Sequence, residues 1–139
     1  MSVNIDACFD LLDKVKQVEL LDQPCRTVVI VYSAWGIIGN GGFQYFFENN
    51  FEGDPPFGVF TQAFDAVGLE EIARRFSELV ALFPFSDPHK SIRKRQEFLD
   101  SQPPDFIAAM TELENLIYQN DNIEETLNSF LQREKRDKA

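Results

Sequence analysis

The stretch that decides the fold is Asn40-Gly41-Gly42-Phe43-Gln44-Tyr45-Phe46-Phe47, followed closely by Asn49-Asn50. Glycine costs the most conformational entropy to order, so two adjacent glycines indicate a turn or a close approach of the backbone. The aromatic residues beside them follow a helical spacing, since Phe43, Phe46, Phe47 and Phe51 stand at i, i+3, i+4 and i+8. The stretch therefore predicts a break, here or at Gly39, and then a short helix with one buried aromatic face.

This motif has two interpretations. In the first, Asn40 caps the following helix with its side-chain oxygen, and the glycines allow tight packing around a phenylalanine core. In the second, Gln44, Tyr45 and Asn49 face a groove and contact a ligand or a peptide. We favour packing and keep the groove as the alternative. The motif residues are Asn40, Gly41, Gly42, Phe43, Gln44, Tyr45, Phe46 and Asn49.

Upstream lies the most apolar segment of the chain, from Cys25 to Ile38. Its β-branched residues would suit a buried strand. The apolar character continues through Trp35, beyond the length of a strand, and so favours a buried helix. An amphipathic helix over residues 3–21 is predicted before it. That helix should end at Asp22-Gln23-Pro24, because proline cannot continue a helix.

Downstream, helical patterns recur between short connectors. A short helix from Phe57 should end at Gly68 in a left-handed cap, and an amphipathic helix over 69–83 follows. Asp87-Pro88 is a helix-start signal for a basic helix over about 89–100. Two more helices are expected, one after Gln102-Pro103-Pro104-Asp105 and one from Ile123. No segment alternates at period two, so we predict a single all-α domain over 1–139, with about seven or eight short helices and a frayed basic tail at 133–139.

The charge is unevenly distributed. The net charge is −10, and neither 27–73 nor 96–132 contains a lysine or an arginine. The bases gather at Lys14 and Lys16, at Arg74 and Arg75, at 90–95 and in the tail. This pattern argues against a general nucleic-acid binder, which needs a basic footprint for phosphates. It permits a basic partner, although an acidic surface that only keeps the protein in solution is the simpler interpretation.

Few residues suggest chemistry. Cys8 and Cys25 match no metal-binding spacing and no disulfide framework, so we expect two buried free thiols. The single histidine, His89, lies in a connector beside Asp87, and no catalytic constellation accompanies it. Residues 121–125 lack the alternating ligands and the glycine of a calcium loop. We therefore expect no enzyme activity, no cofactor and no metal site.

The N-terminus lacks the basic region of a signal peptide, and the longest apolar run, 28–38, is too short for a membrane span. We accordingly expect a cytoplasmic protein with no membrane partner.

The motif at 40–49 resembles the signature of a bacterial domain-of-unknown-function family, in which an asparagine–glycine–glycine–phenylalanine sequence opens an aromatic helix. The order of later features is also similar, with a glycine-closed helix at 63–68 and Leu113-Glu114 shortly before Ile117-Tyr118. The resemblance covers about residues 25–120. The best-known member of that family is a dimeric DNA mimic, so the resemblance implies an all-α fold, a basic DNA-binding partner and a possible homodimer.

Two functions follow as hypotheses. The first is an acidic protein-interaction module of the DNA-mimic kind, whose carboxylates stand in for phosphates. Its candidate partner-binding residues are Glu48, Glu52, Asp54, Glu112, Glu114, Asp121, Glu124 and Glu125. The basic run 90–95 would weaken the field of such a surface unless it lies elsewhere. The alternative is a regulatory or immunity-type binding protein that uses a groove at Asn40–Asn49.

Overall fold

The computed structural model describes residues 4–49, 51, 53–120 and 122–137, and these form helices and connectors without a strand. The elements in chain order are α1 (Ile5–Val15), η1 (Val18–Leu20), α2 (Cys25–Glu48), α3 (Gly58–Ala66), α4 (Glu70–Val80), η2 (Pro88–Lys90), α5 (Ile92–Leu99), α6 (Pro104–Gln119) and α7 (Ile123–Asp137). The all-α prediction is confirmed. The segment 25–38 is helical, as its apolar length indicated.

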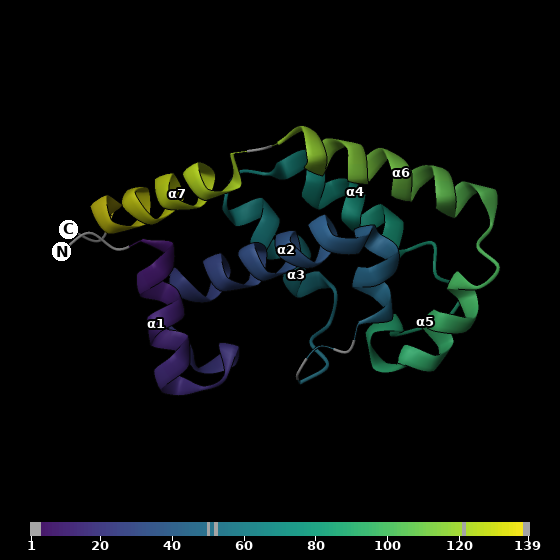
Figure 1. Ribbon diagram of the computed structural model, residues 1–139, viewed down its shortest axis with the longest axis horizontal. Helices are drawn as coiled ribbons and strands as arrows, with labels where there is room; N and C mark the ends of the chain where they lie inside the picture. Colours follow the sequence, from purple (N-terminus) through teal and green to yellow (C-terminus); the bar gives the residue numbers. More distant parts are fainter. Residues whose placement is uncertain (1–3, 50, 52, 121, 138–139) are drawn as a thin grey trace.

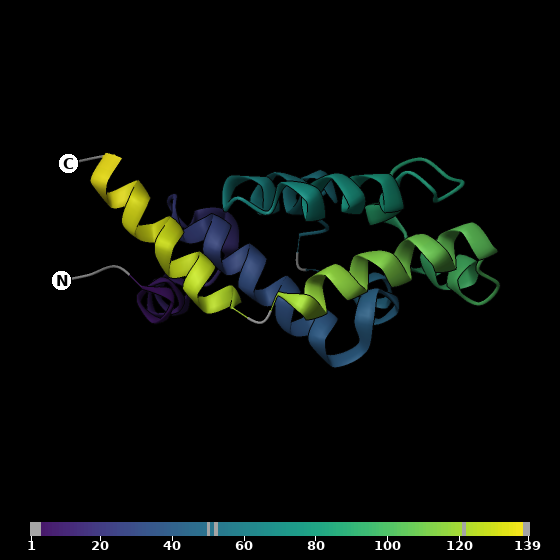
Figure 2. The ribbon, with the colours of Figure 1, turned by 90° about the horizontal axis from the view of Figure 1, so that it is seen from above.

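Helix α2 is the centre of the fold. It packs against α1, α3, α5, α6 and α7 (Figure 1). Its 24 residues include two with non-helical dihedrals, Gly41 and Gly42, so the predicted break is a kink within one long element. Viewed from above, α6 and α7 lie end to end beside it, with α3 and α4 on the other side (Figure 2).

The core is built from phenylalanine rings beyond the kink. Phe43, Phe46 and Phe47 are fully buried, as their spacing predicted. The ring of Phe46 lies 5.7 Å from that of Phe76 on α4, and the ring of Phe47 lies 5.0 Å from that of Phe83. Edge-to-face pairs of this kind add about 0.5–1.5 kcal/mol each to the burial of the rings. The second half of α2 therefore packs against segments that come later in the chain, α4 and the connector after it.

Helix α3 ends as its sequence predicted. Gly68 takes a φ of 92°, the amide of Leu69 donates to the carbonyl of Phe64, and the amide of Gly68 donates to that of Asp65. These two hydrogen bonds make a Schellman motif, which satisfies the last carbonyls of the helix. The buried stripe of α4 also follows the prediction.

Two predicted boundaries are wrong. The first helix ends at Val15 rather than near residue 21, because Lys16 adopts a left-handed conformation and the chain turns into η1. The basic helix α5 begins at Ile92 rather than at about 89, because Ser91 caps it; Asp87 and Pro88 begin the short η2 instead, without a side-chain cap bond. Within the described residues, the basic tail is helical as far as Asp137, the end of α7.

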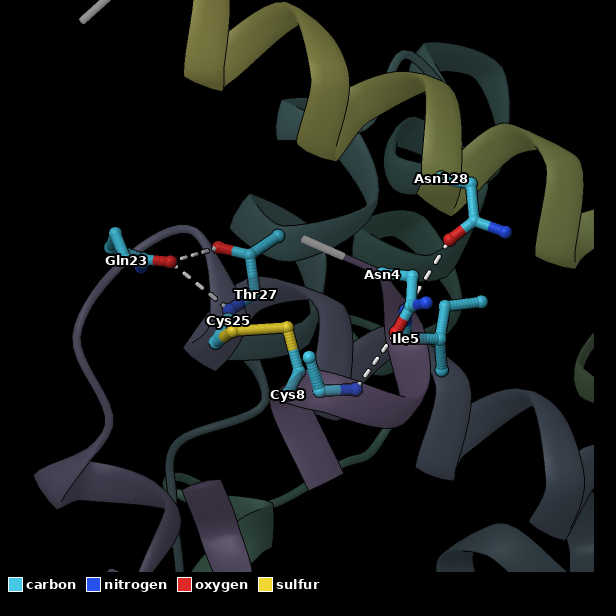
Figure 3. The surroundings of a disulfide bond; sticks show 8 residues. Asn4, Ile5, Cys8, Gln23, Cys25, Thr27 and Asn128 are labelled. Atoms are coloured by element: carbon cyan, nitrogen blue, oxygen red, sulfur yellow. Dashed lines mark hydrogen bonds between the residues drawn. A yellow bond between two sulfur atoms is a disulfide. The ribbon is translucent and has the colours of Figure 1, made fainter. Parts of the chain in front are cut away.

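The prediction of free thiols is also wrong. Cys8 and Cys25 are buried, as expected, but they form a disulfide between α1 and α2 (Figure 3). The turn through η1 brings their Cα atoms to 5.0 Å, inside the range that a disulfide requires. The crosslink joins residues 17 apart, and closing a loop of this size stabilises the fold by about 3 kcal/mol in the chain-entropy model.

Candidate partner-binding site

The glycine motif forms the kink in α2. Gly42 has a φ of 70° and a ψ of −167°, a region that is essentially restricted to glycine. A Cβ on Gly42 would lie 2.8 Å from a carboxylate oxygen of Glu114, and a Cβ on Gly41 would lie 2.6 Å from the Cβ of Tyr45. Both glycines are therefore required by close approach, which agrees with the packing interpretation.

Glu114, and not Asn40, caps the helix beyond the kink. Asn40 is exposed and lies before the break, so the predicted cap is wrong. The Oε1 atom of Glu114, from α6, accepts a hydrogen bond of 3.3 Å from the amide of Phe43. A carboxylate at a helix N-terminus also interacts favourably with the helix dipole. Glu114 thus has a structural role in this fold.

The polar residues of the motif line neither of the described cavities. Gln44 is exposed, donates to Glu48 over 3.1 Å and accepts from Gln102 over 3.4 Å. Tyr45 is 47% exposed, and its Cβ lies against Gly41. Asn49 is half-buried at the end of α2. The described cavity of about 710 Å³ lies between α2 and α3, before the motif, and residues 40–49 do not line it.

Arg95 fixes the end of α2. Its side chain is 3% exposed, and its guanidinium donates to the carbonyls of Phe47 at 2.7 Å, Pro88 at 2.7 Å and Asn49 at 3.0 Å. Burial lowers the pKa of Arg95, and the carboxylate of Asp54 opposes that shift. One sequence signal could have found this role: Arg95 stands between Ile92 and Leu99 on the buried face of α5.

The other basic residues of the run at 90–95 also have partners. Arg93 pairs with Glu97 at 2.8 Å, Lys90 lies 3.7 Å from Asp87, and the ammonium of Lys94 lies 5.9 Å from the ring of Phe85. A similar arrangement holds on α4, where Arg74 and Arg75 pair with acidic neighbours. The basic run therefore opposes the acidic surface less than the sequence suggested.

The six candidate carboxylates that the structure describes lie on different elements. Glu48 is half-buried at the end of α2, and Asp54 is exposed in the following turn. Glu112, on α6, is exposed and pairs with Arg75 at 2.9 Å. Glu124 and Glu125 are exposed at the start of α7. Glu52 and Asp121 lie outside the described residues.

A second group of carboxylates lies on α1, and one of them, Asp6, acts on Tyr32, the tyrosine that donates to Glu124. Asp6, Asp10 and Asp13 are exposed on one face of α1 at i, i+4 and i+7. Helices α1 and α7 contact each other, and the amide of Ile5 donates to the side chain of Asn128 over 3.3 Å. The i, i+4, i+7 spacing was visible in the sequence, but the contact with α7 was not.

Tyr32 connects the two acidic helices. Its hydroxyl donates to Glu124 over 3.0 Å, and its ring packs against that of Phe9 on α1. The hydrogen bond to Glu124 and the charge of that carboxylate raise the pKa of Tyr32, and burial and Asp6 add to the effect. Carboxylates from α1 and α7 therefore act on the same hydroxyl. We call Asp6, Asp10, Asp13, Glu124 and Glu125 the acidic end.

Within the described part of the chain, none of the acidic-end carboxylates forms an ion pair. The residues that the structure describes include no group of three or more His, Cys, Asp or Glu that could hold a metal ion. No described helix is both long and apolar enough to cross a membrane.

These features define an all-α protein with a glycine kink at its centre and unpaired carboxylates at one end. Comparison with family models gives a match to the DMP19-like protein family over residues 19–134. The chain belongs to the DMP19-like family, a family of the DNA-mimic type, as the resemblance at 40–49 predicted. No curated protein and no solved structure matches the chain. Helix α1 precedes the matched region, so Asp6, Asp10 and Asp13 lie outside it.

Proposed function

We propose that this protein is an acidic interaction module that occupies the DNA-binding surface of a basic protein. Membership of a family of the DNA-mimic type supports the class of partner. The observation that carries the proposal is the acidic end, where exposed carboxylates from two helices are free of ion pairs within the described residues. Exposed anions of one sign produce a field that attracts a basic surface and raises the rate of association.

The acidic end suits the role better than the other candidates. Glu114 is held by the kink and Glu112 is paired with Arg75, so neither is free to replace a phosphate. Glu124 and Glu125 are exposed and begin a helix that points its amino end toward α6. Of the eight candidates, these two are retained in the proposal, and the three aspartates of α1 are added.

The spacing of the carboxylates can be compared with DNA. Asp6 and Asp13 are separated by seven residues, or roughly 10 Å along the axis of α1. With Asp10 between them, the helix offers one charge per roughly 5 Å, against one per about 3.4 Å along a single DNA strand. One helix is sparser than a DNA strand, and the carboxylates of α7 raise the local density.

The test is capture of proteins from a bacterial lysate at low salt, followed by elution in a salt gradient and competition with duplex DNA. A basic DNA-binding protein should elute as salt rises and should be displaced by DNA. A partner that ignores both salt and DNA would support the alternative, in which the protein binds through the surface around Gln44 and Asn49.

Matched variants locate the surface. The variant Asp10→Asn/Glu124→Gln/Glu125→Gln should bind the captured partner about tenfold more weakly, because attraction at the acidic end falls. The control Asp65→Asn/Glu70→Gln/Asp100→Asn changes the net charge equally at other exposed sites and should retain most of the affinity. Equal losses in the two variants would show that net charge alone matters.

The family resemblance also implies a homodimer, which we include in the proposal. The molar mass in solution, from light scattering across a range of concentrations, checks it directly. A monomer mass throughout that range would remove the dimer and leave the acidic end as a surface of a single chain.

A further inference from the structure

A cavity of about 710 Å³ lies between α2, α3 and the connector before α3. Val29, Ile30 and Ile37 supply apolar side chains along one face of α2. Val59 and Ala63 face them from α3, and small side chains at this wall leave the space open. The volume lies within the range of roughly 300–1,000 Å³ typical of small-molecule sites, and such sites are mostly apolar with a few polar groups that orient the ligand.

Arg26 lines this cavity in the first turn of α2. Its side chain is half-buried, and within the described residues it forms neither an ion pair nor a side-chain hydrogen bond. On α4 and α5 the arginines are engaged, since Arg75 and Arg93 pair with carboxylates and Arg95 binds carbonyls. An unpaired guanidinium in the wall of an apolar cavity, in a chain of net charge −10, is suited to an anionic group of a ligand.

Among the described residues, one other charged residue, Glu19, lines the cavity, and its position matters for the ligand. Glu19 lies against Gly53, with an oxygen 2.9 Å from the position that a Cβ on Gly53 would occupy. Its carboxylate makes no ion pair with Arg26. An anion beside Arg26 would experience repulsion from Glu19, so Glu19 should weaken binding where Arg26 strengthens it.

We propose that this cavity binds a small amphipathic acid, with its carboxylate on the guanidinium of Arg26 and its apolar body between α2 and α3. The site is separate from the acidic end and does not depend on the proposed function. The cationic group of Arg26 and the apolar side chains of α2 and α3 favour a ligand with one anionic head and one hydrocarbon tail. The class of ligand is a medium-chain carboxylic acid.

The test is titration of the full chain with dodecanoate, below its micelle concentration, followed by calorimetry and by amide shifts of the cavity residues in NMR spectra. Saturable binding with shifts at α2 and α3 is expected. Dodecan-1-ol, which has the same tail without the charge, should bind at least tenfold more weakly, because it cannot make the charge-assisted hydrogen bonds.

Variants separate the charge from the tail. Arg26→Gln should weaken dodecanoate binding about tenfold or more, whereas Lys14→Gln, an equal change of charge outside the cavity, should leave it unchanged. Glu19→Gln should tighten binding. Ser33→Phe, at an exposed position of the cavity wall, should obstruct the tail without a change in the buried core. Far-ultraviolet circular dichroism shows that each variant folds.

The proposal is overturned by any of three results: no saturable binding of dodecanoate, equal binding of the alcohol and the acid, or equal effects of the Arg26 and Lys14 variants. Binding that follows the total charge of the chain, with shifts spread over the whole surface, also overturns it.

Discussion

Charged residues have different roles at the two ends of the molecule. Beyond the kink, Glu114 caps a helix and Arg95 binds three carbonyls, so both charges are parts of the packing. At the acidic end, Asp10 and Glu125 are exposed and form no ion pair within the described residues. Some of the acidic residues, such as Glu114, are therefore fixed by the fold, and others, such as Asp10 and Glu125, are available to a partner.

The comparison also explains why net charge alone is a poor guide to this protein. Burying a charge is tolerated only when it is paired or fully hydrogen-bonded, and the kink region meets that condition. Exposed carboxylates contribute little to stability and can be changed with little effect on the fold. Substitutions in the two regions should therefore differ in what they damage: stability at the kink, and binding at the acidic end.

The largest effect is expected at Arg95. Arg95→Met would leave the carbonyls of Phe47, Asn49 and Pro88 without their donor in a buried site, and we expect a loss of about 3 kcal/mol or more in the free energy of unfolding. Urea denaturation measures it. The control is Arg93→Met, which removes an exposed pair with Glu97 worth at most about 0.5 kcal/mol. Similar losses in the two variants would contradict the structural role of Arg95.

A smaller effect is expected at the kink itself. Gly42→Ala would place a Cβ in a glycine-only region and against Glu114, and we expect a loss of about 1–3 kcal/mol. Gly39→Ala is the matched control, because Gly39 is helical with open space around it. The control should stabilise the protein by up to about 1 kcal/mol. Thermal unfolding of the two variants shows whether each is less or more stable than the original protein. Equal destabilisation by Gly42→Ala and Gly39→Ala would refute the special role of Gly42.

The sequence predicted the parts of the fold that depend on local rules. The spacing of Phe43, Phe46 and Phe47 predicted a buried face, and Gly68 predicted a helix end, because both depend on residues a few positions apart. The failures involve distant partners. Glu114 replaces Asn40 as a cap from α6, and Cys25 meets Cys8 only because the chain turns at Lys16, where no glycine marks the left-handed residue.

The candidate site was predicted less well than the fold. The anionic segments were visible in the sequence, but their pairing was not, since Glu112 meets Arg75 across two helices. The sequence predicts an amphipathic helix over residues 3–21, but it does not indicate that the aspartates of this helix lie near a second acidic helix. The joint effect of Asp6 and Glu124 on Tyr32 depends on the packing of α1 against α7, which no local pattern encodes.

The smallest effect is expected at the acidic end, and it tests whether the carboxylates of α1 and α7 meet there. The hydrogen bond and charge of Glu124 raise the pKa of Tyr32, so Glu124→Gln should lower that pKa toward the ordinary value of tyrosine. Glu125→Gln is the matched control, because Glu125 has no bond to Tyr32. The measurement is an alkaline titration of tyrosinate absorbance in a Tyr45→Phe/Tyr118→Phe background, where Tyr32 is the remaining tyrosine.

The pH dependence of stability follows from the same shift in the pKa of Tyr32. Because the pKa of Tyr32 is raised in the folded chain, its contribution is present below the pKa of the unfolded chain and is lost as the pH rises through the folded value. Glu124→Gln should reduce this alkaline loss and leave stability at neutral pH almost unchanged, since both groups are near the surface. Equal pKa changes in the Glu124 and Glu125 variants would mean that the field at this end is diffuse, and that α1 and α7 do not present their carboxylates as one surface.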